Sequence, residues 1–397
     1  GGTAVADVDD SSAIFHNPSG MGQIGKGNLL LNVSMLTGDL RATPYLFGPQ
    51  SIESERVVAP FFIVGGSGRV HEYVTLGLAV YPVAAASGEY KYQEELTPNQ
   101  ADVTDKTSLI FMEASPAIAV NIDKIGLRIG LGYRITYASL ERYRDSAPLD
   151  VGIHMTGFSF LGFRVGFQWR FTDYITIGMN YRTKTKTKID QSGDPNRTEG
   201  SPAGTGELYA SAETELTLPA RISGGMRFDW APFALMTDFE WGFNSQNDRI
   251  NTQTVDLDGN AGSIPNVFEW EDQWTLRTGA EYRVYKEKIP LRLGFIYDSK
   301  TTNFKYPSGF STPPVHTYSV TAGIGYDHGP WEINFAYARR FGKVLIDEPP
   351  PDNQTPSPDD DSLSRNELLT ECPACGYAGD YRFRINGFYV DFSWDWY

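Results

Sequence analysis

Alternation of apolar and polar residues, repeated from one end of the chain to the other, is the feature that most constrains the fold. In residues 125–138 every odd position holds Ile, Leu or Tyr, whereas every even position holds Gly, Arg, Thr or Ala. Because successive side chains of a β-strand point to opposite faces, this spacing predicts a strand with one apolar and one polar face. Comparable alternation recurs at 174–184, 233–244, 274–283, 291–298 and 331–340.

A single strand of this kind fits either a soluble sandwich or a membrane barrel. The two folds can be distinguished by comparing the polar and apolar faces of all the predicted strands. Their polar faces carry arginines and carboxylates, and aromatic residues gather near the strand ends. In a membrane barrel the apolar faces meet lipid, the charged faces line the lumen, and aromatic girdles lie at the two interfaces. The last predicted strand, 380–396, fits this arrangement because Phe388, Phe392, Trp394 and Trp396 share one face.

Short and long connections alternate along the chain, as they do in outer-membrane barrels with turns on one rim and loops on the other. Many of the segments between them exceed the 9–11 residues that a tilted strand needs to cross a bilayer. We therefore predict an all-β fold, a transmembrane antiparallel β-barrel of about 14 strands that occupies residues 27–397. The predicted strands are 27–36, 57–66, 73–83, 107–121, 125–142, 152–170, 174–190, 205–228, 233–249, 267–285, 290–306, 315–326, 331–346 and 380–396.

The composition agrees with a barrel and excludes a helical membrane protein. Hydrophobic residues make up 41% of the chain and the mean hydropathy is −0.34, and no run of about 18 apolar residues could form a spanning helix. Aromatic residues nevertheless reach 13%, and there are 40 glycines. The net charge of −15 argues against a nucleic-acid partner, which would require basic patches.

Residues 1–26 do not alternate and contain turn-forming sequence, including Asn17-Pro18-Ser19-Gly20. Because a wide barrel has a lumen to fill, and because this segment has apolar residues to bury, we predict that it forms a plug inside the barrel; a disordered leader is the alternative. We also expect a signal sequence and some mature residues upstream of residue 1. The apolar residues in question are Ala13, Ile14, Phe15 and Met21.

The chain resembles the FadL family of outer-membrane transporters (OMPP1/FadL/TodX), which includes carriers of long-chain fatty acids and channels for toluene and similar aromatics. The resemblance begins at GGTAVADVDDSSAIFHNPSGM, which is similar to the family's hatch signature except that Ser19 replaces an alanine. It extends through the aromatic C-terminal strand and covers essentially the whole chain. The intervening segments are 133–143, 179–190, 216–228, 271–283 and 291–299.

The resemblance implies a 14-stranded barrel whose N-terminal hatch, residues 1–26 with Pro18 and Ser19, plugs the lumen. It also implies that ligand enters an inner pocket and leaves sideways at an inward kink in the third strand. Pro82 fits such a kink because it cannot donate a ladder hydrogen bond, and the small residues 84–86 leave the wall thin there. We place the gate at Phe15, Tyr81 and Pro82; the alternative is that Pro82 merely ends the strand.

The same resemblance nominates residues that contact the ligand. Arg142 lies where an arginine of the family meets the ligand carboxylate, and its planar fork suits that role. Asn17 and Phe15 of the hatch are the other candidates. The alternatives are an exposed pair of Arg142 with Glu141 or Asp145, and an Asx-type turn of Asn17 before Pro18.

Two departures from the fatty-acid carriers leave room for a neutral, aromatic substrate. Residues 265–266 are Pro-Asn where those carriers have a lysine, and the loop after residue 142 is short. The remaining lumen arginines are expected to pair with lumen carboxylates and brace the barrel. One face of the predicted strand 174–190 carries Lys184, Lys186 and Lys188. We expect these lysines to contact lipopolysaccharide phosphates, the lumen or solvent.

Cys372 and Cys375 form one CxxC in a late loop, which predicts a local disulfide in an oxidising compartment. A structural zinc site would need four ligands and no second pair exists, so we expect no metal and no cofactor. Asp359, Asp360 and Asp361 could bind calcium, although solvated charge is the commoner explanation.

The sequence carries no GxSxG, HExxH or phosphate-binding glycine loop, so we do not expect an enzyme. We predict a protein of the bacterial outer membrane that passively transports small hydrophobic molecules. Its expected partners are a fatty acid, an aromatic hydrocarbon or a detergent, together with outer-membrane lipid and lipopolysaccharide, and we expect a monomer that binds no nucleic acid. The rival interpretations are a general aqueous porin, a barrel-embedded lipid hydrolase and a soluble all-β protein.

Overall fold

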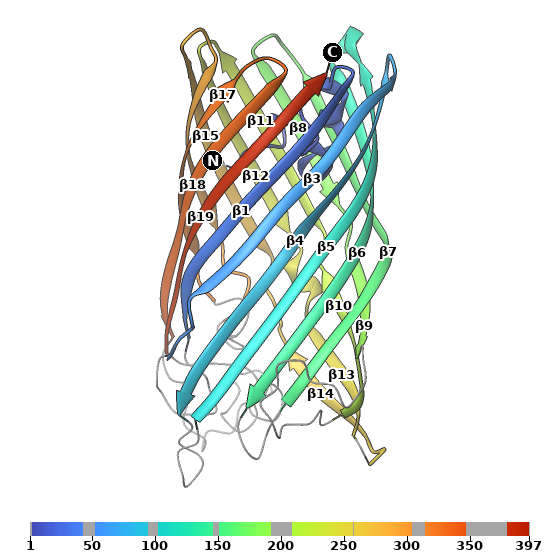
Figure 1. Ribbon diagram of the computed structural model, residues 1–397, viewed down its shortest axis with the longest axis vertical. Helices are drawn as coiled ribbons and strands as arrows, with labels where there is room; N and C mark the ends of the chain where they lie inside the picture. Colours follow the sequence, from blue (N-terminus) through green and yellow to red (C-terminus); the bar gives the residue numbers. More distant parts are fainter. Residues whose placement is uncertain are drawn as a thin grey trace, which may run out of the picture.

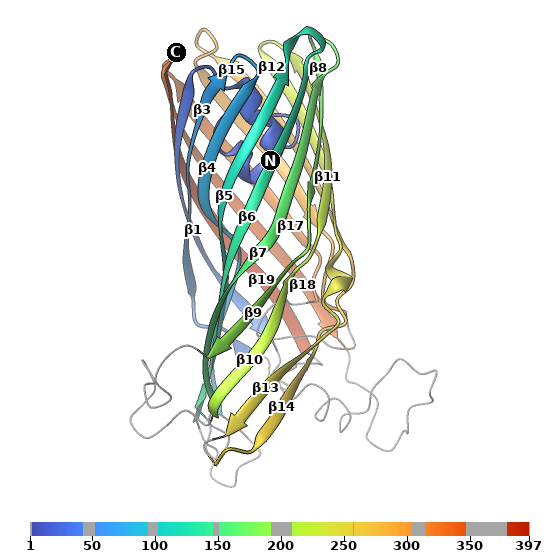
Figure 2. The same ribbon diagram turned by 90° about the vertical axis from the view of Figure 1, so that its right-hand side faces the viewer.

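The computed structural model describes residues 2–42, 52–93, 102–145, 151–191, 209–256, 258–303, 314–346 and 379–396. All of its strands belong to one antiparallel sheet that closes on itself, because β1 (Gly27–Ala42) pairs with β19 (Gly379–Trp396) from Gly27↔Trp396 to Arg41↔Arg382 (Figures 1 and 2). The prediction of a closed transmembrane barrel is thereby confirmed.

The wall contains fourteen strands, four of which are each divided into two pieces. The divided strands are β8 (Ile175–Arg182) with β9 (Thr185–Gln191), β11 (Arg221–Trp230) with β10 (Tyr209–Leu218), β12 (Phe233–Gly242) with β13 (Arg249–Asp256), and β15 (Gln273–Val284) with β14 (Ala261–Val267). The undivided ones, besides β1 and β19, are β3 (Val57–His71), β4 (Val74–Gln93), β5 (Asp102–Ile122), β6 (Leu127–Asp145), β7 (Val151–Arg170), β16 (Ile289–Asp298), β17 (Thr317–Asp327) and β18 (Trp331–Ile346). A two-residue piece, β2 (Ile52–Glu53), pairs with the end of β1.

The side chains follow the alternation that the sequence shows. On β6 the apolar Ile129 and Leu131 are 46% and 44% exposed on the outer surface, whereas Arg134, at an even position of the same strand, faces the lumen and is fully buried. On β19 the outward residues include Phe388, Phe392 and the two terminal tryptophans. This orientation, apolar outside and charged inside, is what a lipid-facing wall requires.

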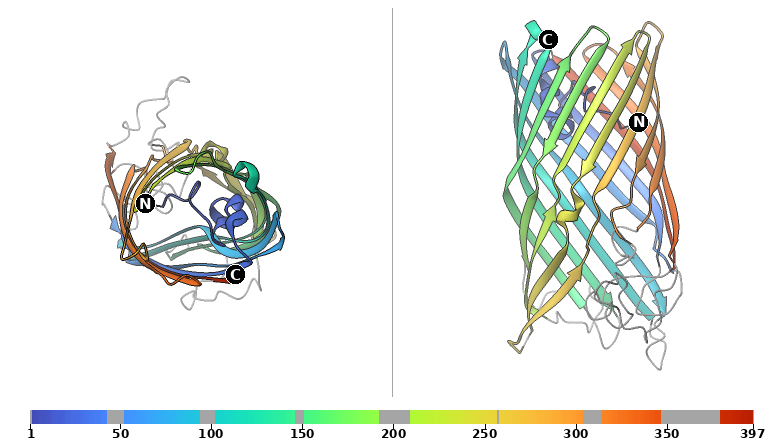
Figure 3. Two further views of the ribbon diagram at one scale, coloured as in Figure 1. Left: turned by 90° about the horizontal axis from the view of Figure 1, so that it is seen from above. Right: turned by 180° about the vertical axis from the view of Figure 1, so that it is seen from behind.

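The N-terminal segment, residues 2–26, lies inside the barrel near the rim that carries the short turns (Figure 3). It contains α1 (Ala13–His16) and the 3₁₀ turn η1 (Pro18–Gln23), with Asn17 between them. Its apolar residues pack against the lumen face of β4 and β5, where Ile14 and Met21 are fully buried beside Tyr81 and Ala119. The 3₁₀ turn η3 (Asp123–Ile125) lies in the turn between β5 and β6, and η4 (Asn244–Gln246) lies between β12 and β13, the two pieces of one divided strand. Among the described residues, no helix has the length and apolar character to span a membrane.

Ion pairs inside the lumen link strands that are adjacent or separated by one strand. Glu113 of β5 accepts hydrogen bonds from Arg134 of β6, and both side chains are fully buried. The other carboxylate oxygen of Glu113 lies 4.0 Å from Nη2 of Arg164 on β7. The predicted pairing of lumen arginines with carboxylates is confirmed for these residues. Further pairs join Arg292 with Glu281 and Glu332, Arg221 and Arg277 with Glu240, and Arg340 with Asp298.

We expect Glu113→Ala to lower the free energy of unfolding by about 3–5 kcal/mol, because it leaves the buried Arg134 without its partner. Urea unfolding in lipid vesicles, followed by tryptophan fluorescence, measures this loss. The control is Glu213→Ala: Glu213 pairs with Lys188 on the outer surface at 2.7 Å and is 51% exposed, so its loss should cost less than about 1 kcal/mol. Equal effects of the two substitutions would contradict a bracing role for the buried pair.

Candidate functional site: three cavities and a gap in the barrel wall

The hydrogen-bonded ladder between β3 and β4 stops part-way along the wall. β3 pairs with β1 from Val57 to Gly68, but it pairs with β4 only from Val64, opposite Val80, to the turn. Beyond Val80, β4 stays paired with β5 as far as Gln93. The next described link across the interruption is the hydrogen bond from Glu55 N to Glu89 O, at 2.7 Å. We call this interruption, between residues 57–63 and 81–88, the wall gap.

Pro82 lies at the start of the wall gap. It has no N–H to donate, and the pairing of β4 with β5 shifts register between Pro82 and Ala84. A bulge of this kind bends the strand away from its former neighbour. The strand nevertheless continues to Gln93, so Pro82 does not end it, and the predicted end at residue 83 was too early.

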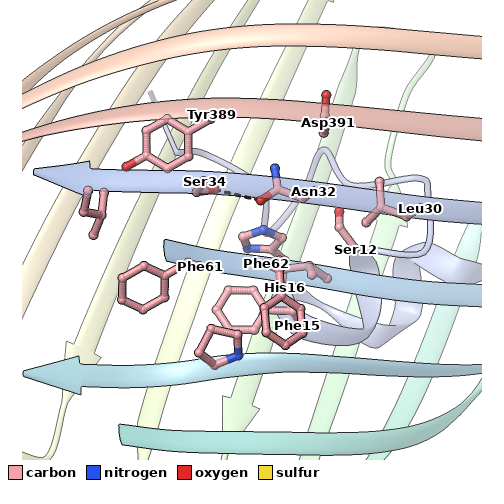
Figure 4. Close-up of a pocket in the computed structure, with 13 residues that line it drawn as sticks. Ser12, Phe15, His16, Leu30, Asn32, Ser34, Phe61, Phe62, Tyr389 and Asp391 are labelled. Atoms are coloured by element: carbon pink, nitrogen blue, oxygen red, sulfur yellow. Dashed lines mark hydrogen bonds between the residues drawn. The ribbon is translucent and has the colours of Figure 1, made fainter. Parts of the chain in front are cut away.

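An apolar cavity of about 420 Å³ lies behind the wall gap, and we call it the wall cavity. Its apolar lining comes from Leu30, Leu36, Phe61, Phe62, Ile63 and Pro82. Asn32 and Ser34, which lie between Leu30 and Leu36 on β1, and Asp391 of β19 add polar atoms, and Ser12, Phe15 and His16 close the cavity from the N-terminal segment (Figure 4). The cavity therefore joins the plug to the gap.

A larger cavity of about 570 Å³ occupies the lumen, and we call it the lumen cavity. One side is apolar and includes residues 83–86, Leu109, Phe111, Leu216 and Trp270. The other side carries Arg164, Arg182, Arg221 and Arg277 with Asp238 and Glu240. The cavity is therefore amphipathic, and Phe15 and His16 line it together with the wall cavity.

Arg182 differs from the other arginines of the lumen cavity. Glu240 is shared by Arg221 and Arg277, at 2.6 and 3.5 Å. Arg182 is 8% exposed, donates to Pro219 O at 3.3 Å, and has no hydrogen-bond partner for its Nε. Within the described part of the chain, no carboxylate forms an ion pair with it. A buried cation without a paired anion is costly, so Arg182 is the group in this cavity best placed to attract an acidic or π-electron-rich ligand.

A third cavity, of about 390 Å³, opens toward the rim with the short turns, and we call it the charged cavity. Its carboxylates are Asp7, Asp9, Asp10, Asp229, Glu281, Glu332 and Asp391, and its arginines are Arg128, Arg170, Arg227, Arg283 and Arg292. His16 also lines it. Burial, together with Arg164 and Arg277, lowers the pKa of His16 to about 4, so the imidazole is neutral at neutral pH.

The N-terminal segment rests on two pairs of glycines in the lumen wall. Gly130 of β6 and Gly166 of β7 lie opposite each other, and a Cβ atom on either one would overlap the backbone or side chain of residues 17–19. Gly178 and Gly225 form a second pair, on β8 and β11, against which Val5 packs. The close approach of the segment to the wall thus requires glycine at these positions.

Hydrogen bonds fix the segment on these glycines. Asn17 donates to Phe167 O at 3.1 Å and to Val5 O at 2.6 Å, and its Oδ1 accepts from Ser19. Arg164 donates to Ile14 O at 2.8 Å. At the other end, Asp238 accepts from the backbone nitrogens of residues 4 and 5, at 2.7 and 3.1 Å. Strands on different sides of the lumen therefore hold one segment.

The sequence matches the family described as outer membrane protein transport protein (OMPP1/FadL/TodX) over residues 1–349. The chain belongs to this family. Its members are bacterial outer-membrane proteins, and the barrel described above places this chain in the same membrane. No curated protein matches the sequence.

Solved structures of OMPP1/FadL/TodX proteins share the fold. A FadL homologue of Pseudomonas aeruginosa is 18% identical with a TM-score of 0.69, and the match covers 100% of this chain and 96% of the homologue. The toluene transporter TodX of Pseudomonas putida is 14% identical with a TM-score of 0.70, again over 100% and 96%. The toluene transporter TbuX of Ralstonia pickettii is 16% identical with a TM-score of 0.67, over the same shares.

The three gate residues predicted for this family member lie together. The rings of Phe15 and Tyr81 are 4.9 Å apart in an edge-on arrangement, and the Tyr81 hydroxyl accepts from Arg164 at 3.3 Å. Pro82 and Phe15 both line the wall cavity. By contrast, the three hatch residues Asn17, Pro18 and Ser19 are buried against Gly130 and Gly166, which we call the glycine seat. They line none of the three cavities. The structure engages Asn17 in an Asx-type turn, and its contact with ligand stays a prediction.

Other predicted residues lie away from the cavities. Arg142 is half-buried near the far end of β6, where it donates to Thr107 Oγ1 at 2.6 Å, and it lines none of the three cavities; its ligand role stays a prediction. Lys186 and Lys188 face outward and pair with Glu215 and Glu213. Cys372, Cys375 and residues 359–361 lie outside the described residues. In the part that is described, no cluster of three or more His, Cys, Asp or Glu could hold a metal ion.

We expect Gly166→Ala to loosen the N-terminal segment, because the added Cβ would overlap Asn17 Oδ1. Overpacking of this kind costs about 1–3 kcal/mol, so amide exchange of residues 13–23 should accelerate by about tenfold or more. Hydrogen exchange read by mass spectrometry in detergent measures this. Gly224→Ala is the matched control, since a Cβ there would meet only Gly178 O at 3.9 Å. Unchanged amide exchange in Gly166→Ala would contradict the requirement for glycine beneath residues 17–19.

Proposed function

We propose that this protein carries small hydrophobic molecules passively across the outer membrane, through the lumen cavity and the wall cavity and then sideways through the wall gap. The interrupted ladder beside an apolar cavity is the observation that carries the proposal. Backbone groups exposed to lipid are normally paired in full, so an interruption within the wall calls for a function. Val58, Val64 and Val80, which flank it, are 61%, 49% and 36% exposed on the outer surface.

The driving force in this proposal is burial of apolar surface. The polar lipopolysaccharide layer resists apolar solutes, whereas a cavity that excludes water favours them by about 25 cal/mol per Å² of apolar surface. Aromatic and aliphatic side chains line both cavities along the route, and the final step delivers the solute to hydrocarbon. No energy source is required.

Phe15 is the gate in this scheme, because it lines the lumen cavity and the wall cavity and packs against Tyr81. Residues 1–26 act as the hatch, and a small shift of α1 on its glycine seat would join the two cavities. We further propose that the protein works as a monomer within lipid and lipopolysaccharide.

The substrate class follows from the lumen cavity. TodX and TbuX are described as toluene transporters, and CymD, which is 14% identical, as a monoaromatic hydrocarbon channel. An aromatic ring suits the apolar side of the cavity and can also stack on the Arg182 guanidinium. A carboxylate would bind Arg182 more strongly through charge-assisted hydrogen bonds. Fatty acids and aromatic compounds can both occupy the apolar side of the cavity and contact Arg182. Fatty acids would bind Arg182 more strongly because they carry a carboxylate.

Substitution of a small residue in the wall gap by a large one should slow transport. Ala85 lies in the gap beside the lumen cavity, and we expect Ala85→Trp to lower the uptake of a hydrophobic probe severalfold while affecting its binding less. Uptake by cells that lack other carriers, compared with probe affinity in detergent, separates the two effects. Leu78→Trp, on the lipid-facing side of the same strand at 54% exposure, is the control. Normal uptake by Ala85→Trp would exclude the lateral route.

Replacing the unpaired arginine should distinguish acidic from neutral ligands. We expect Arg182→Met to weaken binding of a fatty acid by about tenfold to a hundredfold, the worth of a charge-assisted hydrogen bond. Toluene binding should weaken only by about twofold to fivefold, because stacking on the guanidinium is worth about 0.5–1 kcal/mol. Titration calorimetry in detergent measures both affinities.

Arg142→Met is the comparison for this experiment, since Arg142 is the arginine that the sequence nominates. If Arg142→Met weakens fatty-acid binding and Arg182→Met does not, the head-group site lies at the far end of β6 and not in the lumen cavity.

A further inference from the structure

His16 is the residue at which all three cavities meet. It lines the wall cavity, the lumen cavity and the charged cavity, and among the described residues it alone does so. Phe15 is shared by the wall and lumen cavities, Ala4 by the lumen and charged cavities, and Ser12 and Asp391 by the wall and charged cavities. Of the residues between the charged cavity and the other two, His16 has the largest side chain. The imidazole therefore lies between the wall and lumen cavities on one side and, on the other, the charged cavity, which opens toward the rim with the short turns.

The position of the imidazole is well fixed. His16 is the last residue of α1, and its N–H donates to Ser12 O at 3.0 Å. Its ring packs edge-on against Phe15, with centroids 4.7 Å apart at 83°. Arg164 holds the same turn through Ile14 O. Figure 4 shows the side chain pointing from the N-terminal segment into the wall cavity, on the side of Asn32.

Both compartments next to the imidazole can hold water. The charged cavity is lined by carboxylates and arginines, and the wall cavity has Asn32, Ser34 and Asp391 on its polar side. A buried water needs only about one probe sphere of space and two to four polar partners. Removal of the ring would free more space than that, between groups that would hydrate it.

We propose that His16 is the water and ion seal of this transporter: its side chain keeps the charged cavity from joining the wall and lumen cavities. The seal lets hydrophobic ligands leave sideways while the barrel stays closed to ions. This inference concerns the path through the plug and does not depend on which ligand is carried.

The test is ion conductance of the full chain in planar lipid bilayers in concentrated potassium chloride. We expect His16→Ala to give discrete conductance steps at least about tenfold above the wild-type background, because a continuous hydrated path opens. His16→Gln keeps much of the bulk and should stay near background. Phe15→Ala is the matched control: it joins the wall and lumen cavities without reaching the charged cavity, so it too should not conduct.

The selectivity of the leak identifies its path. Seven carboxylates and five arginines line the charged cavity, so any preference for potassium over chloride in the reversal potential of His16→Ala in a salt gradient should depend on these carboxylates. Adding Asp9→Asn and Asp10→Asn should reduce that preference. Heat-modifiable migration on gels verifies that each variant has a folded barrel.

Three results would overturn the seal. His16→Ala could be silent, Phe15→Ala could leak equally, or the leak could be a large pore without ion preference, which would mean that the whole N-terminal segment has left the lumen. The proposed lateral transport fails separately, through loss of the Ala85→Trp effect on uptake, so the two ideas can be told apart.

Discussion

The structure depends on the requirement that backbone N–H and C=O groups facing lipid find partners within the protein. Closure of β1 on β19 removes the free edges that an open sheet would present. The ladder is continuous at most junctions, which makes the interruption between β3 and β4 informative. Pro82 and the bulge that follows it produce this interruption. Because the neighbouring residues are small or apolar, the missing hydrogen bonds coincide with a thin, apolar part of the wall.

The second constraint is the charge inside the lumen. Because charged side chains cannot face hydrocarbon, they point inward, and there they pair across strands or bind the backbone of the N-terminal segment. Glu113, Glu240 and Asp238 each satisfy more than one donor. The result is an interior in which most of the described ionic groups are paired. Against this background Arg182 stands out in the lumen cavity, because no described carboxylate forms an ion pair with it, and the neutral imidazole of His16 stands out because three cavities meet there.

Much of the fold could be predicted from the sequence because a period of two residues fixes which face of each strand meets lipid. The inward direction of Arg134 followed from this rule, and the count of fourteen strands followed from the rule together with the alternation of short and long connections. Phe15, Tyr81 and Pro82 were nominated by a family resemblance. The rule cannot show which inward arginine lacks a carboxylate, since the partners of Arg221 and Arg277 come from a third strand. It also placed the end of the strand at residue 83, whereas β4 bends at Pro82 and continues to Gln93. His16 carried no signal in the sequence, as its importance arises only where three cavities converge.

The attachment of residues 4 and 5 to Asp238 bears on how the protein assembles. These groups are separated by more than half of the chain, and the seat for residues 17–19 requires β6 and β7 to be side by side. Residues 4 and 5, although synthesised before the strands, therefore cannot reach their final position until most of the cylinder has been inserted. Long-range contacts of this kind are slow to form. A nascent barrel accordingly passes through a stage with an unfilled lumen, and docking of residues 2–26 is among the last events of maturation.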